Sequence, residues 1–445
     1  MKRIYSLLAA LIMLVSVTSA GAQDKWSLQK CIDYALKNNI QIKQQTLNTQ
    51  YYNNLLNQAK SNLLPNLNAS VQNSMSFGRS LGADNTYLNV NSNSTSGSIT
   101  TNMTLWSGFT LKNAVKVADM DLKSTLEDLQ KAKDDLMLNI AASYLEILFA
   151  DELVTVAEDQ VKMTQLQIDR TTKLVEAGSL AKGSLLEIEA QSAREELNVV
   201  NAKNRLQLAY LTLYQQLELP STESFLVEKP VLPEITANMS LINTMDIFKN
   251  AVEIRPAVKS AKYKLEGARN QLSIAKGNRL PSLSLNGNYY NYYNNKYMDY
   301  QGNKIAFSDQ LKSNERYGFG VTLSVPIFNR YQARNGVSNS QIQLENTELA
   351  LQNTKNLLRK DIEQAYTNAL AAFKRYVANQ KTVVSSQEAF RYTEEKFNVG
   401  MINSVEYNQS KNNLLTAKSD LLQAKYEYIF RTKILDFYNG RAIEL

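Results

Sequence analysis

Histidine is absent from all 445 residues of the chain. It is the side chain best suited to proton transfer near neutral pH, and it is a common ligand of zinc and iron. Its absence excludes serine–histidine and cysteine–histidine nucleophiles and most zinc or iron sites. No other nucleophile–base pair stands out. We therefore expect no enzyme, and no catalytic, cofactor-binding or metal-ligating residues.

Cysteine is also scarce, and neither sign of charge is in large excess. The single cysteine, Cys31, cannot form a disulfide within the chain. It falls on an amphipathic helix expected from Trp26 to about Lys60, so a buried structural thiol is predicted. The formal net charge is +7, and no block of basic residues marks a nucleic-acid surface. We expect no nucleic-acid partner.

Long apolar runs are missing after the first residues of the chain. Residues 1–22 have the pattern of an export signal: Lys2 and Arg3, an apolar run, and then Ala20-Gly21-Ala22. Residue 23 is glutamine, so no lipid anchor is expected there. We expect an exported chain without a transmembrane helix, which could enter a membrane only as strands.

What the sequence does contain is a duplication. Leu64-Pro65-Asn66-Leu67 has a counterpart in Leu280-Pro281-Ser282-Leu283. After each come two alternating segments and a long helical stretch, interrupted once by a glycine. This predicts a first repeat over residues 23–217, a connector over 218–240, a second repeat over 241–440, and a tail over 441–445.

The alternating segments predict four strands of about ten residues. In the first, Leu67, Ala69 and Val71 fall on one face, and small polar residues fall on the other. About ten residues suffice to cross a bilayer in a tilted barrel strand, but a soluble sheet with one wet face alternates in the same way. The strands are expected at about 67–77, 95–106, 283–293 and 317–327.

Two long helical hairpins are predicted over residues 109–217 and 329–438. Apolar residues recur every seven positions, as at Ile140, Ile147 and Val154, which indicates left-handed coiled-coil packing. The first helix of each hairpin would be roughly 100 Å long at about 1.5 Å per residue. Such hairpins joined to ten-residue strands favour the membrane interpretation.

Four strands cannot close a membrane barrel, and open edges are not tolerated in hydrocarbon. Copies of the chain must therefore pool strands: two copies would give eight and three would give twelve. An eight-stranded barrel is filled by its own side chains, whereas a twelve-stranded barrel begins to leave an aqueous opening. The sequence predicts an α+β membrane protein that forms a trimeric conduit.

Several motifs together resemble the TolC-like outer-membrane efflux family over essentially the whole mature length. They are the two Leu-Pro-x-Leu strand starts, Leu105-Trp106-Ser107-Gly108 with its counterpart Val325-Pro326-Ile327-Phe328-Asn329, and the helix turns at Gly178 and Gly400. The resemblance implies a homotrimeric 12-stranded transmembrane β-barrel, four strands per chain, continued by a long coiled-coil α-helical barrel.

The resemblance also implies a function. The chain would be the exit duct of a tripartite efflux or type I secretion system in the outer membrane of a Gram-negative bacterium. Most of it would lie in the periplasm, with the barrel in outer-membrane lipid. Its partners would be a periplasmic adaptor protein and an inner-membrane RND or ABC transporter. The cargo is not identified by the sequence.

The resemblance further implies two kinds of site residue. The adaptor would contact two glycine-centred tips, although both glycines could also serve only to permit a tight turn. Glu406 matches the first acidic position of a periplasmic gate ring, or is a solvated surface glutamate. Ile402 and Gln409 depart from the family pattern, so the resemblance does not predict how the gate would work. The tip residues are Ala177, Gly178, Ser179, Val399, Gly400 and Met401.

Two other interpretations compete with a channel. A periplasmic adaptor normally has one helical hairpin, whereas two are expected here. A coiled-coil scaffold protein would leave the four strands without a role. The adjacent carboxylates Asp134-Asp135, Glu195-Glu196 and Glu394-Glu395 are predicted to be solvated, because neighbouring helix residues point about 100° apart.

Overall fold

The structure is a computed structural model that describes residues 25–81, 85–89, 91–219, 225–230, 235 and 243–443. The expected export signal, most of the connector and the last two residues of the tail lie outside these residues. The chain divides into two compact units, each of which takes segments from both predicted repeats. One is Asn48–Glu127 with Ser260–Asn353, and the other is Met1–Leu47 with Asp128–Lys259 and Thr354–Leu445. The division into two repeats itself stays a prediction.

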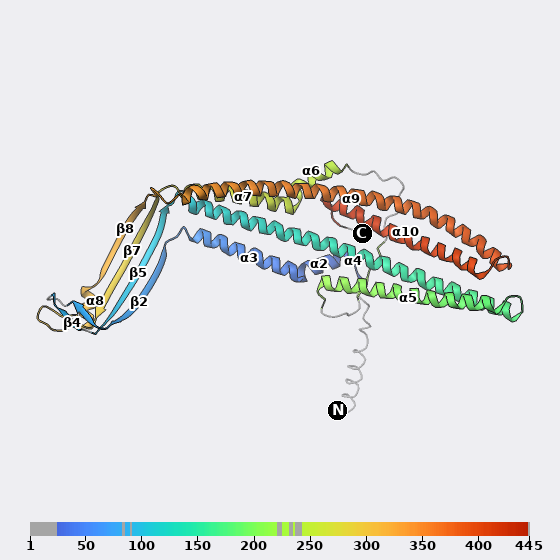
Figure 1. Cartoon of the computed structure of the whole chain (residues 1–445), viewed down its shortest axis with the longest axis horizontal. Coiled ribbons are helices and arrows are strands. Elements are labelled where there is room, and N and C mark those ends of the chain that lie inside the picture. The colour runs from blue at the N-terminus through green and yellow to red at the C-terminus, as the bar shows by residue number, and fades with distance from the viewer. Residues whose placement is uncertain are drawn as a thin grey trace, which may run out of the picture. The chain divides into compact units, whose positions relative to one another are not determined.

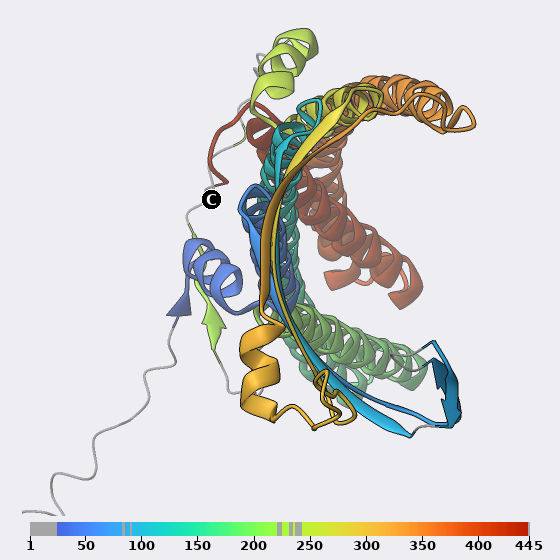
Figure 2. The ribbon, with the colours of Figure 1, turned by 90° about the vertical axis from the view of Figure 1, so that its left-hand side faces the viewer.

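The first unit holds one antiparallel four-stranded sheet, ordered β2-β5-β7-β8 (Figure 1). Each strand lies within a few residues of its expected position. The pairing of β5 with β7 joins strands from the two predicted repeats. The sheet is curved (Figure 2) and open, so β2 and β8 are its edges. The strands are β2 (Asn66–Ser76), β5 (Ser92–Trp106), β7 (Ser282–Asn294) and β8 (Arg316–Ser324).

The register brings the apolar residues of all four strands onto one face. Ala69 lies opposite Ile99, Ile99 opposite Tyr289, and Tyr289 opposite Tyr317. Directly opposed residues share a face, so the alternation of each strand is continued by its neighbours. The other face carries mostly small polar side chains, such as the row Asn68, Thr100, Asn288 and Gly318, together with Tyr290 and Tyr292 of β7.

The alternation expected for β5 fails at Leu105. A register shift between Thr104 and Trp106 places Trp106, rather than Leu105, opposite Leu283. This bulge inserts one residue and re-aims the side chains at the end of the strand. Strand β8 ends at Ser324, before the expected end at residue 327. Pro326 explains the early end, because proline has no N–H to donate to a ladder.

The polar loops between strands have structure of their own. The first contains a small hairpin of β3 (Arg79–Leu81) and β4 (Tyr87–Asn89). The second contains α8 (Phe307–Ser313), which the sequence did not predict. Gln310 of α8 is buried and donates from Nε2 to the carbonyl oxygens of Asn294 and Ile305, at 3.0 and 2.8 Å. Its own Oε1 accepts from the Asn294 N–H, so α8 is bound to the end of β7.

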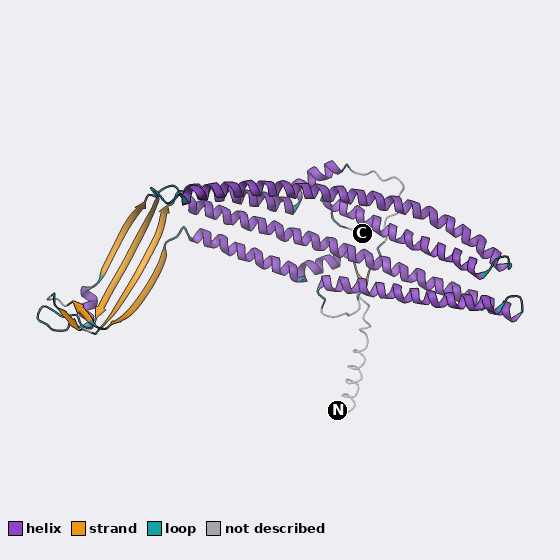
Figure 3. Cartoon of the chain, viewed as in Figure 1, coloured by secondary structure: helices purple, strands orange, loops and turns teal. Residues whose placement is uncertain are grey.

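Long helices account for most of the chain (Figure 3). The two predicted hairpins are present as α4 with α5 and α9 with α10. No described helix has an apolar stretch long enough to cross a bilayer. The helices are α2 (Leu28–Asn38), α3 (Ile40–Ser61), α4 (Thr110–Glu176), α5 (Lys182–Leu217), α6 (Thr244–Ile254), α7 (Pro256–Gly277), α9 (Gln332–Asn398) and α10 (Ser404–Tyr438).

The single helix expected from Trp26 to Lys60 is interrupted at Asn39. This residue has φ −57° and ψ 131°, which ends α2. Its Oδ1 then accepts from the N–H groups of Gln41 and Ile42, at 2.9 and 3.3 Å, and so caps α3. The correction has a local cause: asparagine bonds readily to nearby backbone groups and therefore favours helix ends.

The second unit has its core where α2 packs against the long helices. Cys31, Ile140 and Leu213 are buried there, among other apolar residues of α2, α4, α5 and α10. A short parallel pair, β1 (Lys25–Trp26) with β6 (Leu226–Val227), lies beside this core. The Trp26 ring packs on Phe225, with centroids 4.9 Å apart.

Candidate functional site

The two helical hairpins turn through the same backbone motif. The Gly178 N–H donates to the Val175 carbonyl at 3.0 Å, and the Ser179 N–H donates to the Leu174 carbonyl at 2.8 Å. Gly400 and Met401 repeat the pattern with the carbonyls of Phe397 and Lys396, at 3.0 and 2.9 Å. This pair of bonds defines a Schellman motif at the end of each first helix.

Glycine is required at both turns by backbone conformation. Gly178 has φ +72° and Gly400 has φ +76°, in the left-handed region that other residues avoid. A Cβ at either position would meet no atom within 4 Å, so steric space imposes no further demand.

All six predicted tip residues lie at these turns and are exposed. The tips differ in chemistry. Val399 and Met401 are 70% and 73% exposed and make the second tip apolar. The first tip instead carries the small side chains of Ala177 and Ser179. The sequence placed these residues correctly at the turns; that an adaptor binds them stays a prediction.

Glu406 lies at the third position of α10, beside the N-cap residue Asn403. Asn403 Oδ1 accepts from the Glu406 N–H at 2.9 Å, and Asn403 Nδ2 donates to Glu406 Oε1 at 3.3 Å. The carboxylate is exposed in the single chain. This contact gives Glu406 a role in starting α10, and a gate ring stays a prediction.

An apolar cluster joins the two hairpins just behind the tips. Phe397 stacks on Tyr407 with ring centroids 4.7 Å apart, and Ile188 of α5 packs with them. Ile402, which departs from the family pattern, packs against this cluster. Burial raises the pKa of the Tyr407 phenol to about 12. Tyr407 thus belongs to the apolar packing of the tips.

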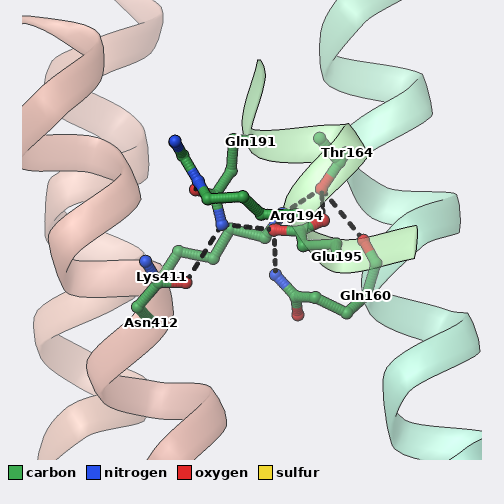
Figure 4. A network of polar contacts seen from close by, with 7 residues as sticks. All are labelled: Gln160, Thr164, Gln191, Arg194, Glu195, Lys411 and Asn412. Carbon is green, nitrogen blue, oxygen red and sulfur yellow. Dashed lines mark hydrogen bonds and ion pairs between the residues drawn. The ribbon is translucent and has the colours of Figure 1, made fainter. Parts of the chain in front are cut away.

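A buried polar network lies farther along the hairpins (Figure 4). Lys411 of α10 lies with Nζ 3.0 Å from Glu195 Oε1 of α5, and both side chains are almost fully buried. Thr164 of α4 donates to Glu195 and accepts from Lys411. Gln191 and Gln160 donate to Glu195 Oε1 at 3.0 and 3.4 Å. Each charge therefore has several partners, as burial requires.

The prediction that the paired carboxylates are solvated is wrong for Glu195 and for Asp134. Glu195 is 1% exposed. It lies seven residues after buried Ile188 on α5, a spacing that would have predicted its burial. Burial lowers the pKa of Lys411, and Glu195 opposes that change. Asp134 is buried beside Arg255, with Oδ2 3.5 Å from Nη1, and burial raises its pKa.

No group of three or more histidine, cysteine, aspartate or glutamate residues in the described part of the chain is placed to hold a metal ion. The tips, the cluster behind them and the buried network instead form a packed pair of hairpins with an exposed end. The arrangement presents an exposed surface at the tips.

The model of one protein family, described as Outer membrane efflux protein, matches residues 31–217 and 247–437. The chain belongs to this family. It is 24% identical over 394 residues to Outer membrane protein TolC of Salmonella enteritidis, covering 84% of this chain and 74% of that protein. It is 22% identical over 410 residues to Toxin and drug export protein A of Aggregatibacter actinomycetemcomitans, covering 90% and 83%. The Campylobacter jejuni CmeC outer membrane channel shares its fold, with a TM-score of 0.77, 18% identity and coverage of 94% and 87%.

Family membership decides between the interpretations that the sequence left open. The chain is a channel protein of the outer membrane that serves efflux or secretion, with a large periplasmic helical part, and it is not an enzyme. The predicted family and location are thereby confirmed. The adaptor and scaffold alternatives are not supported.

Proposed function

We propose that this chain is the exit duct of a tripartite efflux or type I secretion system and works as a homotrimer. The observation that carries the proposal is the open sheet. Strands β2 and β8 each have a neighbour on one side only, and their apolar residues are bare: Leu67 is 75% exposed and Phe319 is 84% exposed.

In hydrocarbon the bare apolar face is favourable, but two unpaired edges are not. Pairing β8 of one copy with β2 of the next removes both edges when the ring closes. Three copies give twelve strands, which leave an opening lined by the small polar face. Two copies would give eight strands, and side chains fill the interior of an eight-stranded barrel.

The helices support the same closure. Five large apolar residues of α5 fall on one side of the helix and are exposed in the single chain. A second copy of the chain would cover this stripe as the strands pair. The stripe consists of Leu186, Leu197, Val200, Leu208 and Leu211.

The duct receives cargo from an inner-membrane RND or ABC transporter through a periplasmic adaptor that binds the tips. Exposed Val399 and Met401 offer the adaptor an apolar contact on a turn that the Schellman motif holds in shape. A threefold ring of Glu406 near this end would set three carboxylates around the opening and favour cations there. The name Toxin and drug export protein A, given to a similar protein, is consistent with cargo of either kind.

Conductance across a planar bilayer tests the duct. The purified full chain should produce discrete steps of current, and a detergent extract without the protein should not. Absence of steps at all protein concentrations, from preparations that reach the outer membrane in cells, would refute the duct.

Co-purification tests the tips. Met401→Ser removes apolar surface from the second tip without changing the glycine turn, so less adaptor should be retained. Met163→Ser is the matched control, because Met163 is an exposed methionine on α4 away from the turns. Equal adaptor recovery from both variants would remove the tip from the proposal.

A further inference from the structure

Four long helices surround a cavity of about 410 Å³ that carries an unusual share of arginine. Arg205 comes from α5, Arg375 from α9 and Arg431 from α10. Two carboxylates, Glu146 of α4 and Glu427 of α10, line the same cavity. No sequence pattern predicts this cavity, because the three arginines lie far apart along the chain.

The carboxylates do not balance the arginines. Arg205 Nε lies 2.9 Å from Glu146 Oε1, and Arg375 Nη2 lies 2.9 Å from Glu427 Oε1. Within the part of the chain that the structure describes, Arg431 pairs with the same Glu427 oxygen, at 3.8 Å from Nη2. The Nε of Arg431 is buried and has no hydrogen-bond partner among the described residues. Three guanidinium groups therefore share two carboxylates, and one buried donor is left without an acceptor.

Aromatic rings form the rest of the wall. Phe149, Tyr426 and Phe430 line the cavity, and the Arg205 guanidinium carbon lies 4.7 Å from the centroid of the Phe149 ring. Guanidinium groups beside aromatic faces suit a ligand with a planar anionic group and an apolar body.

The cavity lies on the inner side of the row of helices. On α4, Ala142, Glu146 and Phe149 face it, whereas Ile147 and Asp151 face a separate cavity beside β6. At about 100° per residue these two sets lie on opposite sides of the helix. Figure 2 shows β1 and β6 on the outer side of the curved row of helices.

We propose that this cavity binds small organic carboxylates with an apolar body. The carboxylate accepts from the accessible terminal nitrogens of the Arg431 and Arg375 guanidinium groups, whose side chains are partly exposed, and the apolar body rests on Phe149 and Phe430. Because the cavity lies on the inner side of the helices, it faces the interior of the duct and favours amphipathic anions as cargo. This second step rests on the proposed function, whereas binding to the cavity does not.

Fluorine NMR of the full chain in neutral detergent measures binding directly. The probe is 4-(trifluoromethyl)benzoate, and its neutral analogue is 4-(trifluoromethyl)benzamide. Both partition into micelles, but only the benzoate can accept from the arginines. We expect the protein to broaden the benzoate signal beyond the protein-free micelle control and to leave the benzamide at the control value. Equal effects on both probes would overturn the site.

Three variants locate the binding. Arg431→Gln should weaken benzoate binding about tenfold, which corresponds to the loss of one charge-assisted hydrogen bond. Arg359→Gln is the control, because it removes an exposed arginine of α9 that pairs with Glu363 instead. Glu427→Gln removes the competing carboxylate and should tighten binding, a gain that misfolding cannot imitate. Unchanged binding in both Arg431→Gln and Glu427→Gln would overturn the site.

The cargo step has its own measurement. In planar bilayers under a KCl gradient, the reversal potential of Arg431→Gln should shift toward that of a more cation-selective channel, while Arg359→Gln should match the original chain. An identical potential in both would refute the cargo step. Failure of every preparation to conduct would refute the duct and leave the benzoate result standing.

Discussion

Cys31 is inert in the folded chain for a physical reason. Its side chain is buried in the core of the second unit, and this burial raises the pKa of the thiol to about 12. The thiolate is the reactive form of cysteine, so a thiol that stays protonated does not react. At pH 8, Ellman's reagent should label native protein negligibly and denatured protein once per chain. Rapid labelling of the native protein would show that the core around α2 opens.

The same pKa predicts how stability depends on pH. The unfolded thiol ionises near its usual value of 9.0, well below the folded one. The contribution of Cys31 to stability is therefore complete below about pH 9 and is lost as pH rises toward about 12. Cys31→Ala should show a smaller fall in unfolding midpoint between pH 8 and pH 10. Parallel falls in the two proteins would contradict the raised pKa.

Glu406 can be tested separately as a cap and as a ring member. Asn403→Ala removes the acceptor for the Glu406 N–H and should cost about 1 kcal/mol of unfolding free energy. Glu406→Gln keeps an oxygen that can accept from Asn403 Nδ2, so it should cost less. It removes the charge, however, and should reduce cation preference in single-channel recordings. An unchanged preference would assign Glu406 to the cap alone.

At the scale of helices, the Lys411–Glu195 pair ties α10 to α5. Lys411→Met leaves the Glu195 charge buried and unpaired, which should destabilise the hairpins by about 3–5 kcal/mol. The double change Lys411→Met with Glu195→Gln removes both charges and should restore most of the loss. Chemical denaturation followed by circular dichroism measures both. A double variant less stable than Lys411→Met would contradict the account.

The elements could be predicted from sequence wherever one period governs them. The two-residue alternation located all four long strands, and the seven-residue repeat located both hairpins. The misses have local causes. Asn39 interrupts a helix by bonding to its own backbone, and the bulge at Leu105 becomes visible only in the pairing with β7.

The candidate site was predictable only where the chain itself turns. Glycine turns at Gly178 and Gly400 follow from the sequence, since each interrupts a long helical pattern. Glu195 of α5 pairs with Lys411 of α10 and with Thr164 of α4, so spacing along one helix cannot identify these partners. Spacing does predict the burial of Glu195, which continues the row of Ile188.

At the scale of the whole molecule, a single chain leaves sheet edges unpaired and apolar surface uncovered. Its sheet has two free edges, and one side of α5 is exposed and apolar. In the proposed trimer, neighbouring copies would pair the sheet edges and cover the apolar side of α5. We therefore expect that the chain has no stable folded monomer outside its oligomer.

The most direct test is the mass of the assembly released from outer membranes by mild detergent, measured by native mass spectrometry. We expect three copies of the mature chain, with no monomer that stays soluble after the detergent is removed. A stable monomer in plain buffer, or an assembly of two copies, would contradict it.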